Sequence, residues 1–195
     1  RILDSARRLF AEQGFDKTTI KDVALDADIT TGAIYHYFDS KQALFRAVTD
    51  EVQQAFLKAF GDAIGKSESF LGRLRAVSEA AVALNDRDSS TAGFIAVMPI
   101  EMRRHPEFED DVARRTSVTI TLFESIVDEA KDRGEIASDA NTRAVANLIL
   151  ATTMGLALFS TLDRERSTYR DASDAYIRLA EGTLFVPDRK TSVGN

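Results

Sequence analysis

The sequence predicts an all-α protein built from two helical domains. Apolar residues recur three or four positions apart along most of the chain, beginning with Ile2, Ala6 and Leu9, and this is the spacing of one face of a helix. The sequence contains no run of alternating β-branched residues, which is the pattern of a strand. Its 195 residues are enough for one or two hydrophobic cores.

A three-helix N-terminal domain is predicted over residues 1–45. Its first helix ends at Gly14, because glycine is favoured just after a helix, and it should pack across the two helices that follow. An N-cap within residues 39–42 begins a long helix that runs to about Ala63 and connects this domain to the second one, residues 46–186. Residues 187–195 are predicted to be a disordered tail.

Two short helices lie between these flanking helices. Thr19 and Asp22 form a capping box at the start of one, which ends near Asp28. Thr30 is the N-cap of the other, which continues over residues 33–38. Its inward side is expected to carry Ile34, Tyr37 and Phe38. Two short helices joined by a tight turn form a helix-turn-helix, whose second helix lies in the major groove of DNA.

Residues 14–44 resemble the DNA-binding domain of the tetracycline-repressor (TetR) family. The match has no gap, and its residues are Gly14, Phe15, Thr18, Thr19, Val23, Ala24, Ala27, Ile29, Thr30, Gly32, Tyr35, Phe38, Lys41 and Leu44. The sequence departs from the family at Asp28, where a glycine is usual in the turn. Aspartate tolerates the left-handed backbone conformation better than most residues, but its charge near the phosphates would lower the affinity for DNA.

The helix-turn-helix geometry assigns candidate DNA contacts. The N-terminal end of the second helix faces base edges, and its residues are Thr30, Thr31, Gly32 and Ala33. Phosphate sites are predicted at Lys41, with the N-terminus of its helix, and at Thr19 with Lys21. The family resemblance adds phosphate contacts from Tyr35, His36 and Tyr37, although Tyr37 is alternatively a core residue.

The charge balance counts against a general nucleic-acid binder. The net charge is −6, and the first sixty residues are not basic either, whereas neutralising phosphates supplies much of the affinity of DNA-binding proteins. What matters for binding is the charge on the docking face, which is doubled in a dimer.

The second domain is predicted to hold helices over residues 70–84, 94–104, 106–134, 144–159 and 169–185, with a kink at Pro99. Residues 144–159 are the most apolar stretch, too short for a membrane span and interrupted by Asn147 and two threonines. In the resembled family the last two helices form a four-helix bundle with a second subunit. The resemblance therefore implies a homodimer interface of Ala144, Leu148, Ala151, Gly155, Phe159, Ala172, Tyr176 and Leu179.

Several apolar side chains of the second domain form either ordinary core or a ligand pocket. The candidates for a pocket are Phe94, Met98, Met102, Phe108, Phe123 and Met154, with a polar contact from Thr119, Asn147 or Thr152. Flexible methionines would suit a pocket that accepts varied ligands. The hypothesis is a small, mostly apolar effector whose binding changes the spacing of two DNA-binding domains.

Enzyme chemistry finds little support in the sequence. It contains no phosphate-cradling glycine loop and no H-E-x-x-H pair, and neither His36 nor His105 has an evident nucleophile partner. No spacing suggests a metal site, and no cofactor is expected. The absence of cysteine and of a signal peptide indicates a cytoplasmic protein. Because Arg1 lies inside a predicted helix, the natural N-terminus is expected to lie upstream.

These patterns predict a sequence-specific transcriptional regulator, a repressor that binds double-stranded operator DNA as a homodimer and has no membrane partner. The small-molecule effector would release it from a palindromic operator. The alternative is a helical small-molecule-binding protein without significant DNA binding, which the acidic N-terminal balance and Asp28 keep open.

Overall fold

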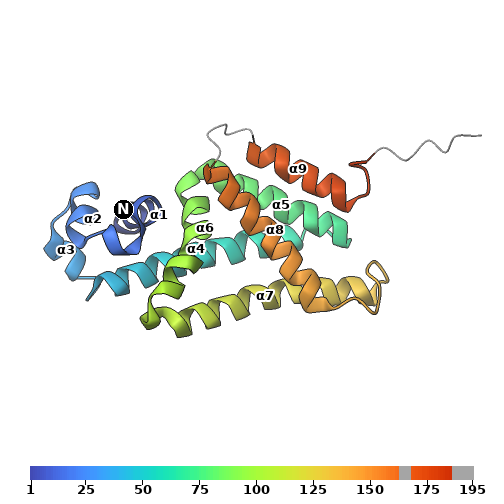
Figure 1. Ribbon diagram of the computed structural model, residues 1–195, viewed down its shortest axis with the longest axis horizontal. Coiled ribbons are helices and arrows are strands. Elements are labelled where there is room, and N and C mark those ends of the chain that lie inside the picture. Colours follow the sequence, from blue (N-terminus) through green and yellow to red (C-terminus); the bar gives the residue numbers. More distant parts are fainter. Residues whose placement is uncertain (163–167, 186–195) are drawn as a thin grey trace, which may run out of the picture.

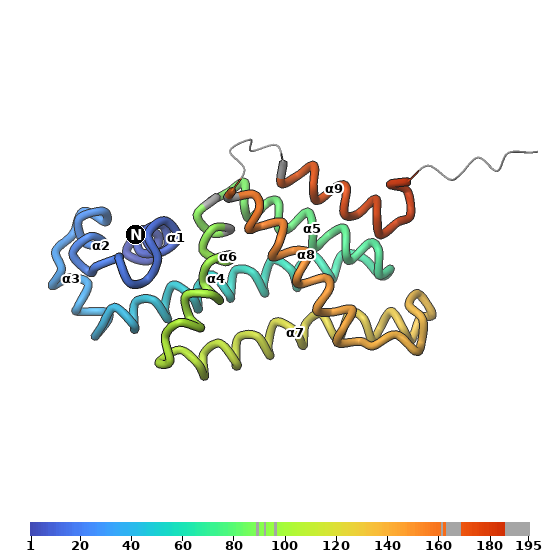
Figure 2. Tube along the Cα trace, in the orientation of Figure 1, coloured from blue at the N-terminus to red at the C-terminus, as the bar shows by residue number. Residues whose placement is uncertain are grey.

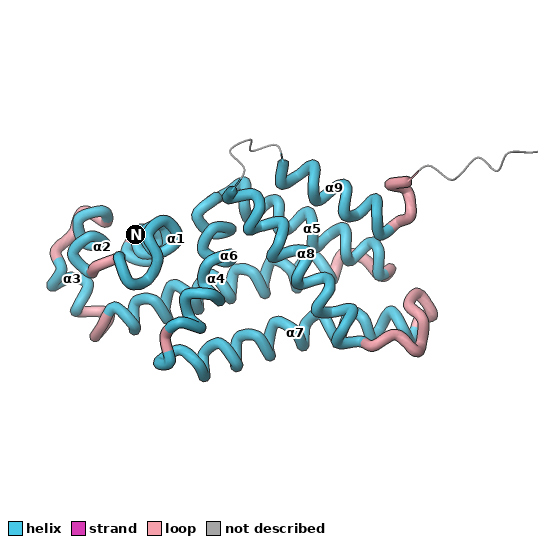
Figure 3. The backbone as a smooth tube through the Cα atoms, viewed as in Figure 1, coloured by secondary structure: helices cyan, strands magenta, loops and turns pink. Residues whose placement is uncertain are grey.

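A computed structural model describes residues 1–162 and 168–185, and the fold of these residues is all-α, as predicted. Helices joined by short loops make up the described part of the chain (Figure 3). Three N-terminal helices form one end of an elongated molecule, and the remaining helices lie beside and beyond them (Figure 1). We call residues 1–40 the head.

The head consists of α1 (Ile2–Lys17), α2 (Ile20–Asp26) and α3 (Thr31–Tyr35). Inside α1 the backbone turns at Gly14, whose φ of +80° favours glycine. The predicted capping box is present: the Thr19 hydroxyl accepts from the Asp22 backbone N–H at 3.1 Å, and the Asp22 carboxylate accepts from the Thr19 N–H at 3.0 Å. The Thr30 hydroxyl caps α3 by accepting from the Ala33 N–H at 3.1 Å.

One inward residue of the head was predicted wrongly. Ile34 is fully buried, but Tyr37 is 70% exposed. The predicted helix over residues 33–38 assumed helical spacing as far as Phe38, whereas α3 ends at Tyr35. The shorter helix leaves the Tyr37 side chain on the outside of the head.

Helix α4 (Lys41–Ile64) starts at the cap Ser40 and runs lengthwise out of the head (Figure 1). Val48 and Val52 on its first half are buried with the residues of the head, whereas Phe60 near its end belongs to a second hydrophobic cluster. Helix α4 thus contributes to both clusters, and the boundary at residue 45 stays a prediction.

The rest of the described chain contains α5 (Phe70–Arg87), α6 (Ser89–Arg104), η1 (Pro106–Phe108), α7 (Glu109–Asp132), α8 (Thr142–Leu162) and α9 (Thr168–Ala180). Helix α6 begins earlier than the predicted residue 94 because Asp88 caps it, accepting from the Ser90 N–H at 2.9 Å. Helix α9 ends before the predicted residue 185, since Gly182 has a φ of +70°. The predicted tail, residues 187–195, lies outside the described residues.

Two hydrophobic clusters fill the interior. The first joins the head to α4, α6 and η1, and at its centre the Phe45 ring lies 5.0 Å from the Phe15 ring and 5.2 Å from the Phe108 ring. The second joins the end of α4 to α5, α7, α8 and α9. Helix α6 therefore contributes to the packing of the head although it is distant from it in sequence.

Helix α8 runs obliquely from α7 across α6 and contacts both (Figure 2). Among the described residues it is the one helix that is long and apolar enough to cross a membrane, with 19 residues (Thr142–Ser160) at a mean hydropathy of 1.4. That criterion is weak for a single helix. Only 22% of this stretch is buried, so α8 exposes an apolar surface on the single chain.

Candidate DNA-binding surface and interior cavity

The predicted DNA contacts gather on one side of the head. Residues from α2, α3 and the start of α4 surround a surface hollow of ≈ 430 Å³. Five of the predicted contact residues line it, namely Thr19, Lys21, Thr31, Tyr35 and Lys41. The hollow also contains Thr18 and Ile20, which are buried; the Thr18 hydroxyl donates to the Gly14 carbonyl at 2.8 Å and so stabilises the end of α1.

The other predicted contact residues lie outside the lining of this hollow. Thr30, Gly32, His36 and Tyr37 are exposed and Ala33 is half-buried. A Cβ atom added at Gly32 would have the Thr30 hydroxyl at 3.8 Å as its only neighbour within 4 Å among the described residues. The packing of this chain therefore does not require a glycine there, and the missing side chain leaves room on the outer surface.

The two lysines of the hollow differ in their surroundings. The Lys41 ammonium donates to the Phe15 carbonyl at 2.8 Å and to the Asp16 carbonyl at 3.3 Å, and it lies 4.3 Å from the centre of the Phe15 ring. Lys41 therefore holds the start of α4 to the end of α1 after the kink at Gly14, a segment (residues 14–17) that we call the α1–α2 turn. The sequence did not indicate this structural role. Lys21 is exposed and forms no hydrogen bond or ion pair within the described part of the chain.

The arginines of α1 are engaged with carboxylates away from the hollow. Arg7 pairs with Asp88 at 2.6 Å, and Arg8 pairs with Asp26. At the start of α2, hydrogen bonds from Thr19 hold the pKa of the Asp22 carboxyl below its usual value. The positive charge available in the hollow therefore comes from its two lysines.

Asp28 occupies the turn between α2 and α3 in the left-handed conformation, with a φ of +53°. This confirms that aspartate can replace the usual glycine there. Its side chain is fully exposed and lies 3.9 Å from the Arg1 guanidinium. The negative charge is thus on the surface, beside the motif.

A narrow apolar cavity lies in the second domain, between α4, α5, α6, α8 and α9. Its volume is ≈ 20 Å³, room for about one water molecule. The lining consists of Phe56, Phe60, Ala81, Leu84, Asn85, Thr91, Ile95, Thr153, Met154, Ala157 and Tyr169. Burial raises the pKa of Tyr169 to about 12, so its hydroxyl stays protonated near neutral pH and can donate a hydrogen bond.

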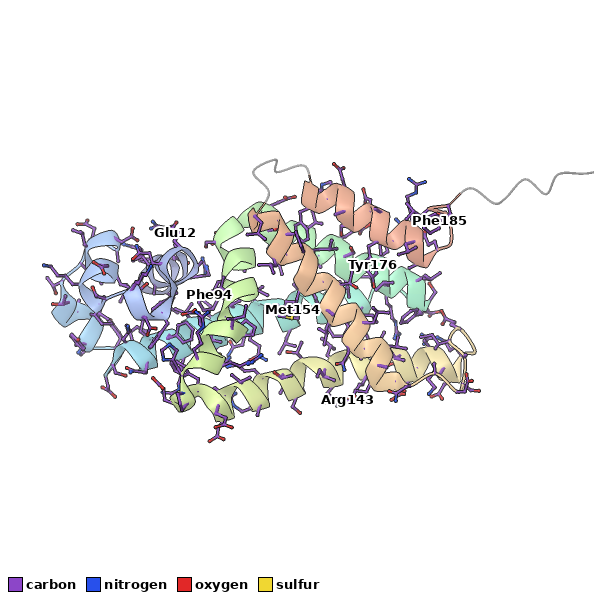
Figure 4. All side chains as sticks on the ribbon, viewed as in Figure 1. Glu12, Phe94, Arg143, Met154, Tyr176 and Phe185 are labelled. Atoms are coloured by element: carbon purple, nitrogen blue, oxygen red, sulfur yellow. The ribbon has the colours of Figure 1, made fainter. Side chains whose placement is uncertain are left out.

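Among the predicted pocket residues, Met154 lines this cavity and the others lie outside its described lining. Phe94, Met102 and Phe108 are buried in the first cluster, against the head, and Met98 packs beside them. Figure 4 shows Phe94 on the side of α6 toward the head and Met154 on α8. Residues 94, 98 and 102 share one face of α6, and the sequence could not tell which cluster that face meets.

The polar residues predicted for the pocket also lie elsewhere. The Thr119 hydroxyl donates to the Arg115 carbonyl at 3.0 Å, and the Thr152 hydroxyl donates to the Leu148 carbonyl at 2.9 Å. Asn147 is exposed on α8, and Phe123 lies in the second cluster. Phe56 and Phe60 were not predicted as cavity residues, because their spacing of four on α4 shows only that they share a face.

The predicted dimer residues lie on the outer side of α8 and α9. Phe159 is 68% exposed, Leu148 64% and Leu179 51%, which is unusual for such large apolar side chains. Ala144 and Ala151 are also exposed, and Gly155, Ala172 and Tyr176 are half-buried. Together they leave an apolar surface that the single chain does not cover.

A capped pair of short helices on a three-helix head, with the second helix exposed, defines a helix-turn-helix DNA-binding protein. The family described as "Bacterial regulatory proteins, tetR family" matches residues 2–48, and the one described as "Tetracyclin repressor-like, C-terminal domain" matches residues 71–176. The chain therefore belongs to the TetR family of bacterial transcriptional regulators.

Individual relatives agree with this membership. The HTH-type transcriptional regulator UidR of Escherichia coli K12 is 29% identical over 157 residues, which are 80% of this chain and 78% of UidR. The HTH-type transcriptional repressor KstR2 of Rhodococcus jostii RHA1 is 45% identical over 56 residues, 29% of this chain and 26% of KstR2.

A solved structure shares the fold over nearly the whole chain. The crystal structure of the transcriptional regulator FadR from Bacillus subtilis, in complex with stearoyl-CoA, has a TM-score of 0.80. It covers 94% of this chain and 98% of FadR at 19% identity, and this similarity concerns the fold. This chain is a DNA-binding transcriptional regulator.

Proposed function

We propose that this regulator represses transcription by binding, as a homodimer, to a palindromic operator. The observation that carries the proposal is the hollow on the head, where three helices bring together Thr19, Lys21, Thr31, Tyr35 and Lys41. The two lysines carry positive charges that suit phosphates. The hydroxyl groups of the threonines and the tyrosine can form hydrogen bonds to phosphates or base edges. A dimer seated on the operator would block transcription of the DNA it covers.

In this proposal, the residues at the start of α3 contact base edges, and the other predicted residues contact phosphates. Thr30, Thr31, Gly32 and Ala33 read base edges from the start of α3. The threonine hydroxyls can bond to bases or touch a thymine methyl group, and Gly32 lets the wall of the groove approach closely. Thr19, Lys21, Tyr35, His36, Tyr37 and Lys41 contact phosphates. Phosphate contacts fix the register of the protein, and base contacts specify the sequence.

The homodimer forms through α8 and α9. Their exposed apolar side chains, with Leu148 and Phe159 the most prominent, would be buried against the same surface of a second subunit. Pairing would place the two heads on one side of the dimer, with their recognition helices one DNA turn of about 34–36 Å apart, or a multiple of it. The small residues Ala144, Ala151 and Gly155 permit a close approach of the helices.

A small, mostly apolar effector binds at the cavity between α4, α5, α6, α8 and α9. Because the cavity holds about one water molecule, the effector must separate these helices to enter. Tyr169 supplies a buried hydroxyl for one polar group of the effector. The wider similarity to FadR fits an apolar ligand, although that protein's stearoyl-CoA is not assigned to this chain.

Helix α6 would carry the effect of the ligand to the head. Thr91 and Ile95 near its start line the cavity, and Glu101 near its end accepts a hydrogen bond from the Phe15 backbone N–H at 3.0 Å. Ligand that displaces α6 favours a dimer whose heads no longer fit the operator. The size of this population shift is set by the difference in ligand affinity between the two states.

The roles of the two domains and the cellular location follow from this function as a repressor. Residues 1–45 form the DNA-binding domain and residues 46–186 the effector-binding and dimerisation domain. The protein acts in the cytoplasm, where operator DNA and effector are both present, and we expect no enzymatic activity. No bound cofactor is needed for any step.

The test is selection of bound sequences from random duplexes at two salt concentrations. We expect a palindromic consensus and an affinity that falls steeply with salt. A control protein with Thr31→Ala and Lys21→Ala should lose the consensus. No enrichment at low salt would refute the proposal and favour a helical small-molecule-binding protein.

A further inference from the structure

The last turn of α6 is joined to the end of α1. Glu101 is buried, and its carboxylate accepts from the Phe15 N–H at 3.0 Å. A Cβ atom at Gly14 would lie 3.2 Å from the Glu101 carboxylate, so the glycine also lets this side chain approach. This contact fixes the position of the head relative to α6.

His105 follows directly after α6 and enlarges this contact. Its ring packs edge-on against Phe15, 4.8 Å between ring centres, and against Phe108 at 6.0 Å. The side chain is 16% exposed. A histidine with two aromatic neighbours is thus held between the head and η1.

The two ring nitrogens of His105 face carboxylates on opposite sides. Nε2 lies 3.4 Å from the Asp16 carboxylate of the head, and Nδ1 lies 3.9 Å from the Glu107 carboxylate of η1. Nε2 is buried and makes no hydrogen bond within the described part of the chain. The neutral ring therefore leaves one buried polar atom unsatisfied.

The cations around His105 already have partners. Lys41 of α4 bonds to carbonyls of the α1–α2 turn, and Arg104 of α6 pairs with Glu101 at 3.0 Å. Arg46 of α4 pairs with Asp111 of α7 at 2.7 Å and donates to the Glu107 carbonyl. Among the described residues, the carboxylates of Asp16 and Glu107 have no ion-pair partner besides His105.

We propose that His105 is a proton-sensitive contact that joins the head to α6 and η1 more tightly in mild acid. A protonated imidazole carries an N–H on each nitrogen, and here a carboxylate lies within 4 Å of each nitrogen. The contact spans three elements, so the protonated ring holds Asp16 of the head and Glu107 of η1 to the end of α6. Acidification then restricts the orientation of the head, without any small-molecule ligand.

The direction of the pH dependence follows from the charges. The favourable interaction exists when the His105 imidazole is charged, and it is lost when rising pH removes the ring's proton. The link between His105 and Asp16 therefore stabilises the folded protein at low pH and not at high pH.

The test is a double-mutant cycle of His105→Gln and Asp16→Asn, with the free energy of unfolding of the full chain measured at about pH 5.5 and about pH 8. We expect a coupling of about two- to fivefold in the unfolding equilibrium constant at the lower pH, the range of partly exposed ion pairs. At the higher pH the coupling should vanish. Equal coupling at both pH values, or stronger coupling at the higher one, would overturn the proposal.

A matched control is the exposed pair of Lys58 and Asp62 on α4, whose atoms lie 2.7 Å apart. Because this pair contains no histidine, the cycle of Lys58→Gln and Asp62→Asn should give the same coupling at both pH values. If His105→Gln does not fold, Glu107→Gln and Asp16→Asn are compared with the unmutated protein. Both should lose stability in acid alone, and a loss that is independent of pH would refute the proposal.

Discussion

Lys21 is the lysine of the hollow whose charge is available to DNA. It is exposed and has no hydrogen bond or ion pair to any residue that the structure describes. Lys21→Ala should therefore weaken binding to all duplexes about equally and lower the slope of log affinity against log salt by about 1. The measurement is a salt titration of binding to the selected operator and to a scrambled duplex. A loss confined to one base position would contradict the assignment to phosphate.

Lys41→Ala makes an informative comparison because Lys41 also bonds to carbonyls of the α1–α2 turn. We expect this variant to lose thermal stability as well as affinity, whereas Lys21→Ala should keep the stability of the unmutated protein. Sequence spacing indicated the phosphate role for both lysines. The second role of Lys41 depends on a contact 26 residues away along the chain, which spacing cannot show.

Asp28 combines a left-handed backbone with an exposed negative charge. Asp28→Asn should raise operator affinity severalfold at low salt, because it removes the charge and keeps a side chain that tolerates this conformation. Asp28→Gly should raise the affinity equally and change the stability by less than about 1 kcal/mol. Binding assays at low and high salt check the charge effect, which should shrink as salt rises.

At the scale of elements, α6 connects the cavity to the head. Thr91 and Ile95 near its start line the cavity, while its buried apolar side chains pack in the first cluster, against the head. Glu101→Ala leaves the Phe15 N–H buried without an acceptor, and we expect a loss of about 1–3 kcal/mol in unfolding free energy. Glu101→Gln keeps an acceptor oxygen and should lose less. Equal losses in chemical denaturation would show that the hydrogen bond is not what holds α6 to the head.

The sequence predicted the local features of the elements well. The capping box at Thr19 and the cap at Thr30 depend on neighbours within a few residues, and both are present. The predicted helix end at Gly14 is instead a kink inside α1, which continues to Lys17. Tertiary packing could not be predicted in the same way. Periodicity showed that residues 94, 98 and 102 share a face of α6, but whether that face meets the head or the cavity depends on how helices distant in sequence pack.

At the scale of the whole molecule, the exposed side of α8 and α9 is the proposed surface of assembly. Leu148→Glu or Phe159→Glu would place a charge in the proposed subunit interface, where it could not be solvated. We expect a monomer in analytical ultracentrifugation, unchanged helix content and at least about a tenfold loss of operator affinity, or about 1.4 kcal/mol.

The control is Leu71→Glu on α5, because Leu71 is 40% exposed and lies outside the proposed interface. This variant should remain a dimer and bind the operator normally. A dimer that survives both changes on α8 would instead place the interface on another surface. The sequence predicted that α8 is apolar on most sides, and the structure adds that much of that surface is open to a partner.

The small cavity limits what a cell can signal through this protein. If the effector binds here, a molecule larger than one water must first separate the helices around the cavity. The free energy needed for this opening reduces the binding free energy of the effector. Traces of a metabolite would then leave the genes silent, and derepression would begin only above a threshold concentration. Such a regulator responds only to a high concentration of its effector, which suits genes that are needed only after a substrate has accumulated.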